Sequence, residues 1–469
     1  MKTIKYMWMA CVAFAAVSLT ACSDDDGNSY PDGNAPVVVN AIYLEDADGT
    51  VKDRPVDFAR LGQTIRLEGS GFGGTRHVLV NGYDTYFNTT LVTDRNMVLQ
   101  LAATTPILSA DPEYRNKIVF VKDGGAEYSC DLTIRAASPS ISGISNSMPQ
   151  PGETVIVYGA NLQETTEIVL PGGVTLSGSQ ITSDEDGEWY SFVMPEGITE
   201  GGYISSTGAN GYAQTPAFFN QTKGLILNFD GVGTQGFWSW SETGSMINSE
   251  DLVSDPLNSG RGNVVKIIPD RLLNDGIVPG KGRATECWTA GNDNAADDWT
   301  HFVTDGLFEE STPLDEIAFQ FDVYCPQPWS GTGQIEISAQ NNASWTGYGS
   351  SETKSSTTQI FVWVPWLNED GTVTPFQTEG WQTVTIPLSK LSKYANMLED
   401  GDIPVFKNII DDRNAASYKN FGMGFVNTEI TVGEVTIEAQ NAKFEIYLDN
   451  WRIVPYKKVT ISDFPDEEE

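Results

Sequence analysis

Aromatic rings set among amides and hydroxyls are the residues of this chain best suited to contact a ligand. The stretch from Trp329 to Trp366 holds four Trp and one Tyr among Gly, Ser, Thr, Asn and Gln. A flat ring covers the apolar C–H face of a sugar while nearby amides bond its hydroxyls, so the pattern predicts a carbohydrate contact. The predicted stacking rings are Trp329, Trp345, Trp363 and Trp366, with Tyr348, Trp288 and Trp299 as lesser candidates, and the predicted hydroxyl-bonding side chains are Gln334, Glu336, Gln340, Asn341 and Asn342.

The alternative is that these rings fill a core. Trp329 and Trp345 stand next to Gly and Ser in turn-rich segments, which favours exposed rings, because loops carry function on a scaffold. Trp363 lies on a strand-like run, Phe361-Val362-Trp363-Val364, where the core and ligand interpretations are equally supported.

The charge of the chain restricts the class of ligand. A formal net charge of −35 argues against nucleic acid and against anionic polymers, because binding either requires clustered Lys and Arg. A neutral partner fits better. The 469 residues, 40% hydrophobic with 12 Trp, indicate a globular chain of several domains.

Few residues are available for metal or nucleophilic chemistry. The two His, His77 and His301, are far apart in sequence, which disfavours a His-based zinc site and a Ser/His triad. Outside the leader, Cys130, Cys287 and Cys325 lack metal-ligand spacing and allow at most one internal disulfide.

The N-terminus predicts export. Lys2 and Lys5 precede an apolar run that is too short to span a bilayer, so residues 1–21 are expected to be a cleaved signal peptide. Leu19-Thr20-Ala21-Cys22 resembles the bacterial lipobox, which implies an acylated Cys22 and a flexible tether over residues 22–35. The run from Ser23 to Asp26 resembles the acidic signal of Bacteroidetes lipoproteins that face the cell surface from the outer membrane.

A repeat organises the first half of the chain. The segment Gly62–Phe72 matches Gly152–Leu162 at an offset of 90 residues, and each alternates apolar and polar side chains as a half-buried strand does. These segments resemble the IPT/TIG immunoglobulin-like family. The resemblance implies two β-sandwich spacers, at residues 36–136 and 137–220, joined by short Pro-bearing linkers into a stiff rod.

The remainder predicts one large β-sandwich over residues 224–458, followed by an acidic tail at 459–469. Phe319, Phe321 and Val323 alternate with polar residues, as do several later segments, and residues 387–399 have helical spacing. The fold class expected for the whole chain is therefore all-β: two immunoglobulin-like sandwiches, then a larger jelly-roll-like one.

Three segments, 225–231, 381–388 and 446–453, resemble jelly-roll carbohydrate-binding modules. The resemblance implies that the first and last strands pair and that Asp230 and Asp449 are candidates for a structural calcium site. Calcium takes six or more oxygen ligands, so a polar strand end is the alternative, and no cofactor is expected to be required.

Taken together, the chain resembles the surface glycan-binding proteins of Bacteroidetes polysaccharide-uptake systems whose terminal domain binds xyloglucan. The resemblance implies a non-catalytic lipoprotein that captures a neutral β-linked plant glycan, xyloglucan or another β-glucan. It also implies a TonB-dependent transporter and companion binding proteins as partners.

Other functions stay open. A β-sandwich glycoside hydrolase needs two carboxylates across a cleft, and Asp322 with Glu336 is a candidate pair, although the chain lacks the closely spaced Glu-x-Asp-x-x-Glu strand motif of β-sandwich glucanases. A different hemicellulose such as galactomannan is another ligand, and a protein-binding adhesin would use the same rings against a protein partner.

Overall fold

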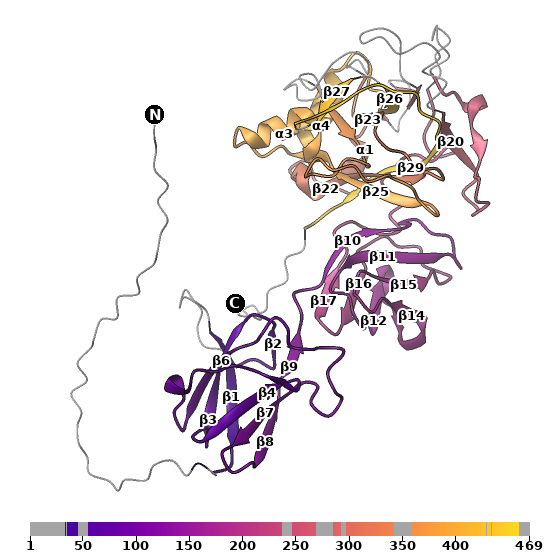
Figure 1. The fold of residues 1–469 in the computed structure, drawn as a ribbon. Coiled ribbons are helices and arrows are strands. Elements are labelled where there is room, and N and C mark those ends of the chain that lie inside the picture. Colours follow the sequence, from indigo (N-terminus) through magenta and orange to yellow (C-terminus); the bar gives the residue numbers. More distant parts are fainter. Residues whose placement is uncertain are drawn as a thin grey trace, which may run out of the picture. The chain divides into compact units, whose positions relative to one another are not determined.

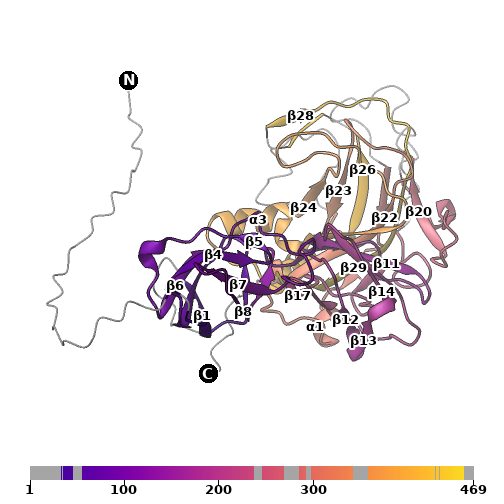
Figure 2. The same ribbon diagram turned by 60° about the horizontal axis from the view of Figure 1, so that its bottom comes forward.

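The computed structural model describes residues 33, 35–45, 55–236, 246–268, 285–291, 297–341, 358–427, 429–432 and 434–458. The chain divides into two compact units, Met1–Ile134 and Arg135–Glu469 (Figures 1 and 2). Strands dominate both units, which confirms the predicted all-β class. None of the described helices has the length and the apolar run that crossing a bilayer requires.

The first unit contains a small β-sandwich. Its strands are β1 (Val38–Glu45), β2 (Phe58–Arg60), β3 (Thr64–Ser70), β4 (Thr75–Val80), β5 (Tyr83–Asp84), β6 (Asn96–Gln100), β7 (Lys117–Lys122), β8 (Glu127–Asp131) and β9 (Thr133–Arg135), with a 3₁₀ turn, η1, at Thr89–Leu91. The sheets have the orders β1-β3-β6 and β5-β4-β7-β8, and β2 pairs β9. Inward side chains such as Leu67 and Phe120 form its core.

The second unit begins with another small sandwich. Its strands are β10 (Ser140–Ile144), β11 (Thr154–Ala160), β12 (Glu167–Leu170), β13 (Val174–Ser177), β14 (Ile181–Ser183), β15 (Trp189–Val193), β16 (Ser205–Gly208) and β17 (Gly211–Gln214), with 3₁₀ turns η2 (Pro171–Gly173) and η3 (Gly178–Gln180). The sheets have the orders β10-β11-β15-β14 and β13-β12-β16-β17. The expected boundaries 137–220 and 224–458 both lie inside this unit and stay predictions.

A repeated glycine explains why the two small sandwiches share a sequence pattern. Gly69 on β3 and Gly159 on β11 lie where the neighbouring strands β1 and β10 bulge. A Cβ on Gly69 would come within 1.9 Å of the Val38 carbonyl oxygen, and one on Gly159 within 2.0 Å of the Ser140 carbonyl oxygen. The partner strand therefore fills the position of the side chain, and only glycine fits there.

The large sandwich completes the second unit. Its strands are β18 (Leu225–Leu227), β19 (Val253–Ser254), β20 (Asn263–Ile267), β21 (Thr285–Trp288), β22 (Ile317–Tyr324), β23 (Gln334–Ser338), β24 (Ile360–Trp363), β25 (Gln382–Pro387), β26 (Gly422–Val426), β27 (Ile430–Val432), β28 (Val435–Ile437) and β29 (Ile446–Pro455). Its helical segments are η4 (Ser249–Asp251), α1 (His301–Thr304), η7 (Leu314–Glu316), η8 (Leu388–Lys390), α3 (Ser392–Glu399) and α4 (Phe406–Ala415).

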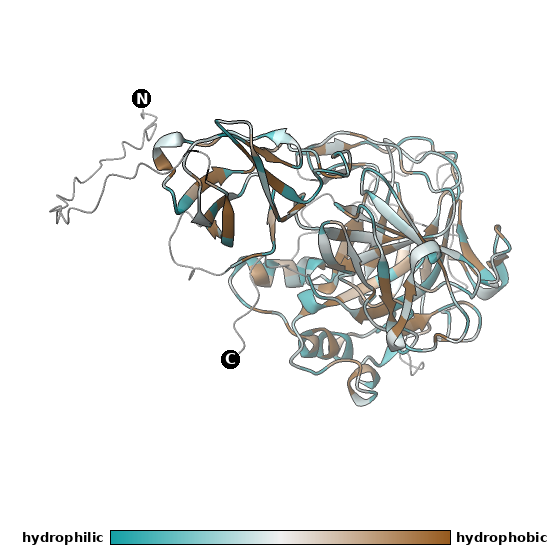
Figure 3. Cartoon of the chain, turned by 90° about the horizontal axis from the view of Figure 1, so that it is seen from below, coloured by the Kyte–Doolittle hydropathy of each residue, from teal (hydrophilic) through white to brown (hydrophobic). Residues whose placement is uncertain are grey.

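Two sheets enclose the core of the large sandwich. One has the order β19-β20-β29-β22-β25 with β18 also paired to β29, which confirms the predicted pairing of the first and last strands; the other has the order β21-β26-β23-β24. Hydrophobic residues concentrate on the strands (Figure 3), and those between these two sheets form one cluster. The helical stretch predicted at 387–399 is confirmed for α3 but begins as the separate turn η8, whereas α4 was not foreseen.

The outer face of the larger sheet is polar and buried. Gln320 and Asp322 on β22, Thr383 on β25 and Arg452 on β29 point away from the core and meet Ser147 of the second small sandwich. Arg452 Nη2 donates to Asp322 Oδ1 at 2.9 Å and to Ser147 Oγ, and the Ser147 amide donates to Thr383 Oγ1 at 2.9 Å. We call these five residues the joint network.

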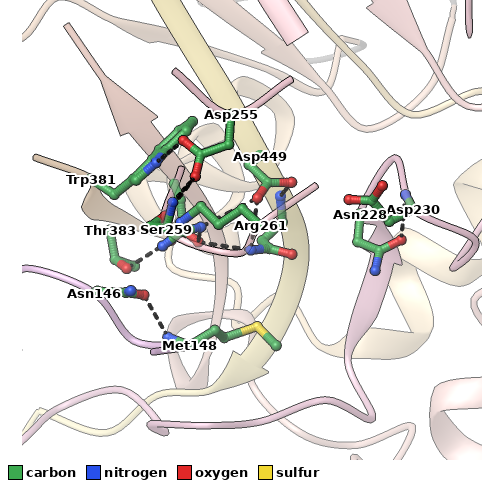
Figure 4. A network of polar contacts seen from close by, with 12 residues as sticks. Asn146, Met148, Asn228, Asp230, Asp255, Ser259, Arg261, Trp381, Thr383 and Asp449 are labelled. Atoms are coloured by element: carbon green, nitrogen blue, oxygen red, sulfur yellow. Dashed lines mark hydrogen bonds and ion pairs between the residues drawn. The ribbon is translucent and has the colours of Figure 1, made fainter. Parts of the chain in front are cut away.

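A second arginine extends this network along the sheet. Arg261, in the turn between β19 and β20, donates to Asp322 at 2.7 Å and to Asp449 at 3.3 Å (Figure 4). Its guanidinium lies over the Trp381 ring, 4.7 Å from the ring centre. The buried carboxylate of Asp322 thus lies between two buried guanidinium groups, those of Arg452 and Arg261, and its charge is paired as a buried charge requires.

Replacing Gly159 by Ala is expected to destabilise the second small sandwich by about 2 kcal/mol, because the added Cβ would push β10 off β11. Calorimetric unfolding of the second unit would measure the loss. Gly143→Ala is the matched control, since Gly143 lies on β10 and an added Cβ there meets nothing within 4 Å. Equal effects of the two substitutions would contradict the steric explanation.

Replacing Asp322 by Asn is expected to lower the stability of the large sandwich by about 3 kcal/mol, because the Arg452 guanidinium would stay buried without its counter-charge. Asp315→Asn, at an exposed position just before β22, should change stability by less than about 0.5 kcal/mol. Thermal unfolding of both variants compares them, and a neutral result for Asp322→Asn would refute the importance of the pair.

The pKa of Asp322 determines the pH range of its contribution. Burial by itself would raise that pKa, but the charges of Arg452 and Arg261 outweigh burial and lower it to about 2. A carboxyl whose pKa falls on folding stabilises the protein above its unfolded pKa of about 4. The difference in Tm between Asp322→Asn and the unchanged protein should therefore hold down to about pH 4 and shrink as the pH falls toward 2.

Candidate functional site

The sheet β21-β26-β23-β24 carries polar side chains on its outer face. On β23, Ile335 and Ile337 belong to the core. Because side chains alternate along a strand, Gln334, Glu336 and Ser338 point to the opposite, outer face. All three are buried, so this face is covered as well as polar.

Two carboxylates flank a glycine on this outer face. Glu336 on β23 and Glu286 on β21 are both paired with Gly424 of β26, one from each side. On the same face, the Trp288 indole donates to Glu286 at 2.8 Å. Its ring lies on the β26 backbone, where a Cβ on Gly422 would come within 2.1 Å of it. Gly422 and Gly424 of β26 have no side chains, and this makes room for the groups on either side.

The polar face retains hydrogen-bonding capacity. Gln334 is fully buried, yet neither atom of its amide has a partner among the described residues. The side-chain oxygen of Gln340, just beyond β23, is buried and without a partner in the same way. Buried amides normally have partners, so these groups leave hydrogen-bonding capacity on this face that the described residues do not use.

A hollow of about 760 Å³ lies along β24, the edge strand of the same sheet. We call it the β24 hollow. Its floor is apolar and its rim is polar, the arrangement typical of small-ligand sites. The floor includes Val362, Trp363 and Leu367, and the rim includes Asn368, Asp370 and Glu434, the last from the turn between β27 and β28.

Trp363 connects the β24 hollow to the core. Its ring meets Phe321 of the opposite sheet, Trp329 and Phe376 edge to face, at centroid distances of 5.3, 5.7 and 5.3 Å. The residue remains partly exposed and lines the hollow. Trp363 therefore packs against the core, as one of the two interpretations predicted, and its role as a ligand contact stays a prediction.

The rim of the hollow is a structured turn. Asn368 donates from its side-chain amide to the hydroxyls of Thr372 and Thr374, at 2.8 and 3.0 Å. Asp370 accepts from the amide and hydroxyl of Thr372, and these hydrogen bonds lower its pKa. The carboxylate of Asp370 and the side-chain oxygen of Asn368 are therefore held as acceptors beside Trp363.

The expectation of exposed rings is wrong for four predicted residues, which are buried: Trp329 (0% exposed), Trp366 (2%), Trp288 (1%) and Trp299 (1%). The turn-rich neighbours of Trp329 fold over the core and do not lift the ring out of it. Its backbone pairs with Phe376, and its indole donates to the Thr332 carbonyl at 2.8 Å. Trp299 is covered by the Arg413 guanidinium, 4.2 Å from its ring centre.

The structure brings several predicted polar residues together. Gln334 and Glu336 share the outer face with Trp288, and Gln340 follows on the same strand extension. The predicted residues Trp345, Tyr348 and Asn342, and the predicted lipidation residue Cys22, lie outside the described residues.

The two predicted calcium ligands do not share a site. Asp230 accepts from the backbone and side chain of Asn263, at 3.0 and 2.9 Å, and lies apart from Asp449 in Figure 4. Asp449 faces Arg261, and burial raises its pKa to about 8 against the opposing charge of that arginine. Among the described residues, no group of three or more His, Cys, Asp or Glu could hold a metal ion.

The carboxylate pair Asp322 and Glu336 is also separated. Asp322 lies on the outer face of the larger sheet, within the joint network, whereas Glu336 lies on the outer face of the other sheet. The core lies between them, so the two cannot act on one bond from either side of a cleft, and this pair is excluded as a catalytic pair.

Sequence reasoning missed Glu286 and the rim residues Asn368, Asp370 and Glu434. The run Asn368-Glu369-Asp370-Gly371, with Gly371 at a φ of 81°, was a readable turn signal next to a predicted ring. Nothing comparable marked Glu286 or Glu434, because their positions depend on which strands pair.

The comparisons with known proteins agree with this architecture. The "Surface glycan-binding protein B xyloglucan binding domain" family matches residues 219–455. An IPT/TIG domain-containing protein of Bacteroides ovatus is 23% identical over 317 residues, 67% of this chain and 52% of the relative. The chain thus spans about half the length of this curated relative.

A solved structure has the same fold. The surface glycan-binding protein PbSGBP-B of Prevotella bryantii superimposes with a TM-score of 0.60 at 19% identity, covering 90% of this chain and 99% of that one. The immunoglobulin-like and large sandwiches thus recur together in a second protein. With its large sandwich matched by the family over half of the sequence, this chain belongs to the surface glycan-binding protein B family.

Proposed function

We propose that this protein binds a neutral β-linked glycan, xyloglucan or another β-glucan, in the β24 hollow without cleaving it. The observation that carries the proposal is the partly exposed residue Trp363, which lines a hollow together with amide and carboxylate acceptors. Neither Lys nor Arg is found among the described residues that line it, which suits an uncharged ligand. The match to a xyloglucan-binding family supports the choice of sugar.

The chemistry of the hollow suits a flat sugar backbone. The ring of Trp363 covers apolar C–H groups, while Asn368 and Asp370 accept hydrogen bonds from hydroxyls at the rim. Each ring contact contributes about 1 kcal/mol, so a few rings with hydrogen bonds give binding between about 1 μM and 1 mM. Many anchored copies on one cell would retain a long chain more strongly through avidity.

Binding without hydrolysis is supported by the state of the carboxylates. Glu286 and Glu336 flank Gly424, but both are buried, and Glu286 already accepts from the Trp288 indole. A glycosidase needs two carboxyl groups open to the scissile bond and to water. We therefore propose that these side chains support the sheet and take no part in bond cleavage.

The proposal includes a location at the cell surface and partners in the outer membrane. Cys22 carries the lipid anchor that holds the protein in the outer membrane, facing the cell surface, and the two small sandwiches act as spacers. A TonB-dependent transporter and companion binding proteins receive the captured glycan. The lipobox-like run before Cys22 supports the anchor.

No metal ion is required for binding in this proposal. Support comes from Asp230 and Asp449, whose carboxylates are engaged by Asn263 and Arg261. Retention by a xyloglucan gel should accordingly be the same in EDTA as in calcium, and a loss of retention in EDTA would reject this part of the proposal.

Trp363→Ala is expected to weaken retention in a xyloglucan affinity gel by about fivefold, because it removes a ring contact worth about 1 kcal/mol. Phe376→Ala tests whether loss of packing alone has the same effect, because the partly buried Phe376 packs against the Trp363 ring and is not among the described residues that line the hollow. Gels with galactomannan and a reducing-end assay separate the alternatives: retention by galactomannan alone changes the ligand, and released reducing ends identify a hydrolase.

Trp329→Ala gives the contrasting result. It is expected to cost about 3–5 kcal/mol of stability, because Trp329 is fully buried against Trp363, Phe425 and Phe444. Thermal unfolding should show a large loss for Trp329→Ala and a smaller one for Trp363→Ala. If Trp363→Ala is folded and still retained like the unchanged protein, the proposed site is wrong.

A further inference from the structure

A second groove lies within the second unit, between its small and large sandwiches. Its volume is about 520 Å³, within the usual range for ligand sites. One wall comes from β11 and the turn before it, including Asn146 and Tyr158, and the other from the approach to β25, including Glu379, Trp381 and Gln382. We call it the joint groove. It lies on the opposite sheet of the large sandwich from the β24 hollow.

The walls of the joint groove are held in place by buried contacts. Ser147, next to Asn146, donates from its backbone amide to Thr383, next to Gln382, so the joint network connects the two walls of the groove. The Trp381 indole donates to Asp255 at 3.0 Å, which fixes the ring at the groove wall. A ligand would meet a preformed surface and would not have to order it, which lowers the cost of binding.

The lining of the joint groove has the chemistry of a sugar contact. Tyr158 is half-buried and offers both a ring and a hydroxyl, and burial followed by the charge of Glu379 raises its pKa, so the hydroxyl keeps its proton. Gln382 adds an amide, and the side chain of Asn146 is held by hydrogen bonds to the Met148 amide and to Glu153.

Charge selects among ligands for the groove. Glu153 and Glu379 line it, and neither Lys nor Arg occurs among the described residues that do. Phosphates, uronic acids and nucleic acids would be repelled by the two carboxylates, whereas hydroxyl groups would donate to them. A polyhydroxylated, uncharged ligand satisfies the amides, the phenol and the carboxylates at once.

We infer that the joint groove is a second carbohydrate-contact site, which binds a neutral oligosaccharide segment through Tyr158 and Gln382, beside the buried ring of Trp381. The inference rests on the proposed function, because it assigns the same class of ligand to both sites. A long glycan chain could then be held at two places on one protein, and the second contact would raise retention of polysaccharide more than that of short oligosaccharides.

The test uses the purified full chain labelled with 5-fluorotryptophan and followed by ¹⁹F NMR. Trp381 reports on the joint groove and Trp363 on the β24 hollow, and their signals are assigned with Trp381→Phe and Trp363→Phe. A soluble xyloglucan oligosaccharide is titrated, with a malto-oligosaccharide as the α-linked comparison. The expected result is that both signals move, each with its own saturation curve.

Variants then localise the effect. Tyr158→Ala and Gln382→Ala should each weaken the affinity measured from the Trp381 signal by about fivefold. The affinity measured from the Trp363 signal should stay unchanged. Tyr212→Ala is the matched control, because Tyr212 is an exposed tyrosine of the same small sandwich, on β17, outside the groove. It should alter neither curve.

The outcomes separate the two proposals. Movement of Trp363 alone would overturn the second site and leave the β24 hollow standing. Movement of Trp381 alone, sensitive to Tyr158→Ala, would support the joint groove and reject the hollow. If the Trp381 signal saturates at the same ligand concentrations as the Trp363 signal and is unchanged by Tyr158→Ala, the second site is overturned. If neither signal moves, both proposed sites are overturned.

Discussion

The joint network holds the second small sandwich against the large one through Ser147, which accepts from Arg452 and donates to Thr383 and Gln320. Asp322 and Arg452 both lie on the outer face of a sheet of the large sandwich, and their buried ion pair positions the guanidinium that donates to Ser147. A buried charge pair contributes little net stability over an apolar contact, but it is costly to break and has strict geometry. The two sandwiches are therefore fixed in one orientation within the second unit.

Because the larger sheet packs against the second small sandwich, the two sheets of the large sandwich differ in how much outer surface a ligand could reach. The larger sheet gives its outer face to the joint network, so only its margin, at the joint groove, is left to a ligand. No residue of the joint network lies on the sheet β21-β26-β23-β24. The edge strand of that sheet, β24, borders the hollow that contains Trp363. The polar alternation on β22 and on β23 looks alike in sequence, yet one face binds a neighbouring domain and the other supports the candidate site.

Aromatic residues have two functions in the large sandwich. Trp329, Trp363, Phe425 and Phe444 pack in edge-to-face and stacked contacts that fill the space between the sheets. Trp363 is the member of this group that reaches the margin. Its ring is held by neighbours on several sides, so its exposed part is presented to the outside without freedom to collapse. A rigid ring loses little entropy when a sugar binds, which favours recognition by a surface that is otherwise polar.

The sequence by itself determined the features that depend on neighbouring residues along the chain. Alternation on Phe319, Phe321 and Val323 identified a strand. The repeated glycines at 69 and 159 marked matching strands, because a position without room for a Cβ requires glycine.

Only the tertiary structure decided which faces are covered. Trp329 was predicted to be exposed from its Gly and Ser neighbours, but it is buried because Phe376 and Phe444, distant in sequence, close over it. Asp322 and Glu336 looked like partners along the chain, and the core separates them because their strands lie in different sheets. Exposure is a property of contacts between distant segments, and for that reason the local pattern predicted the strands but not which rings are buried.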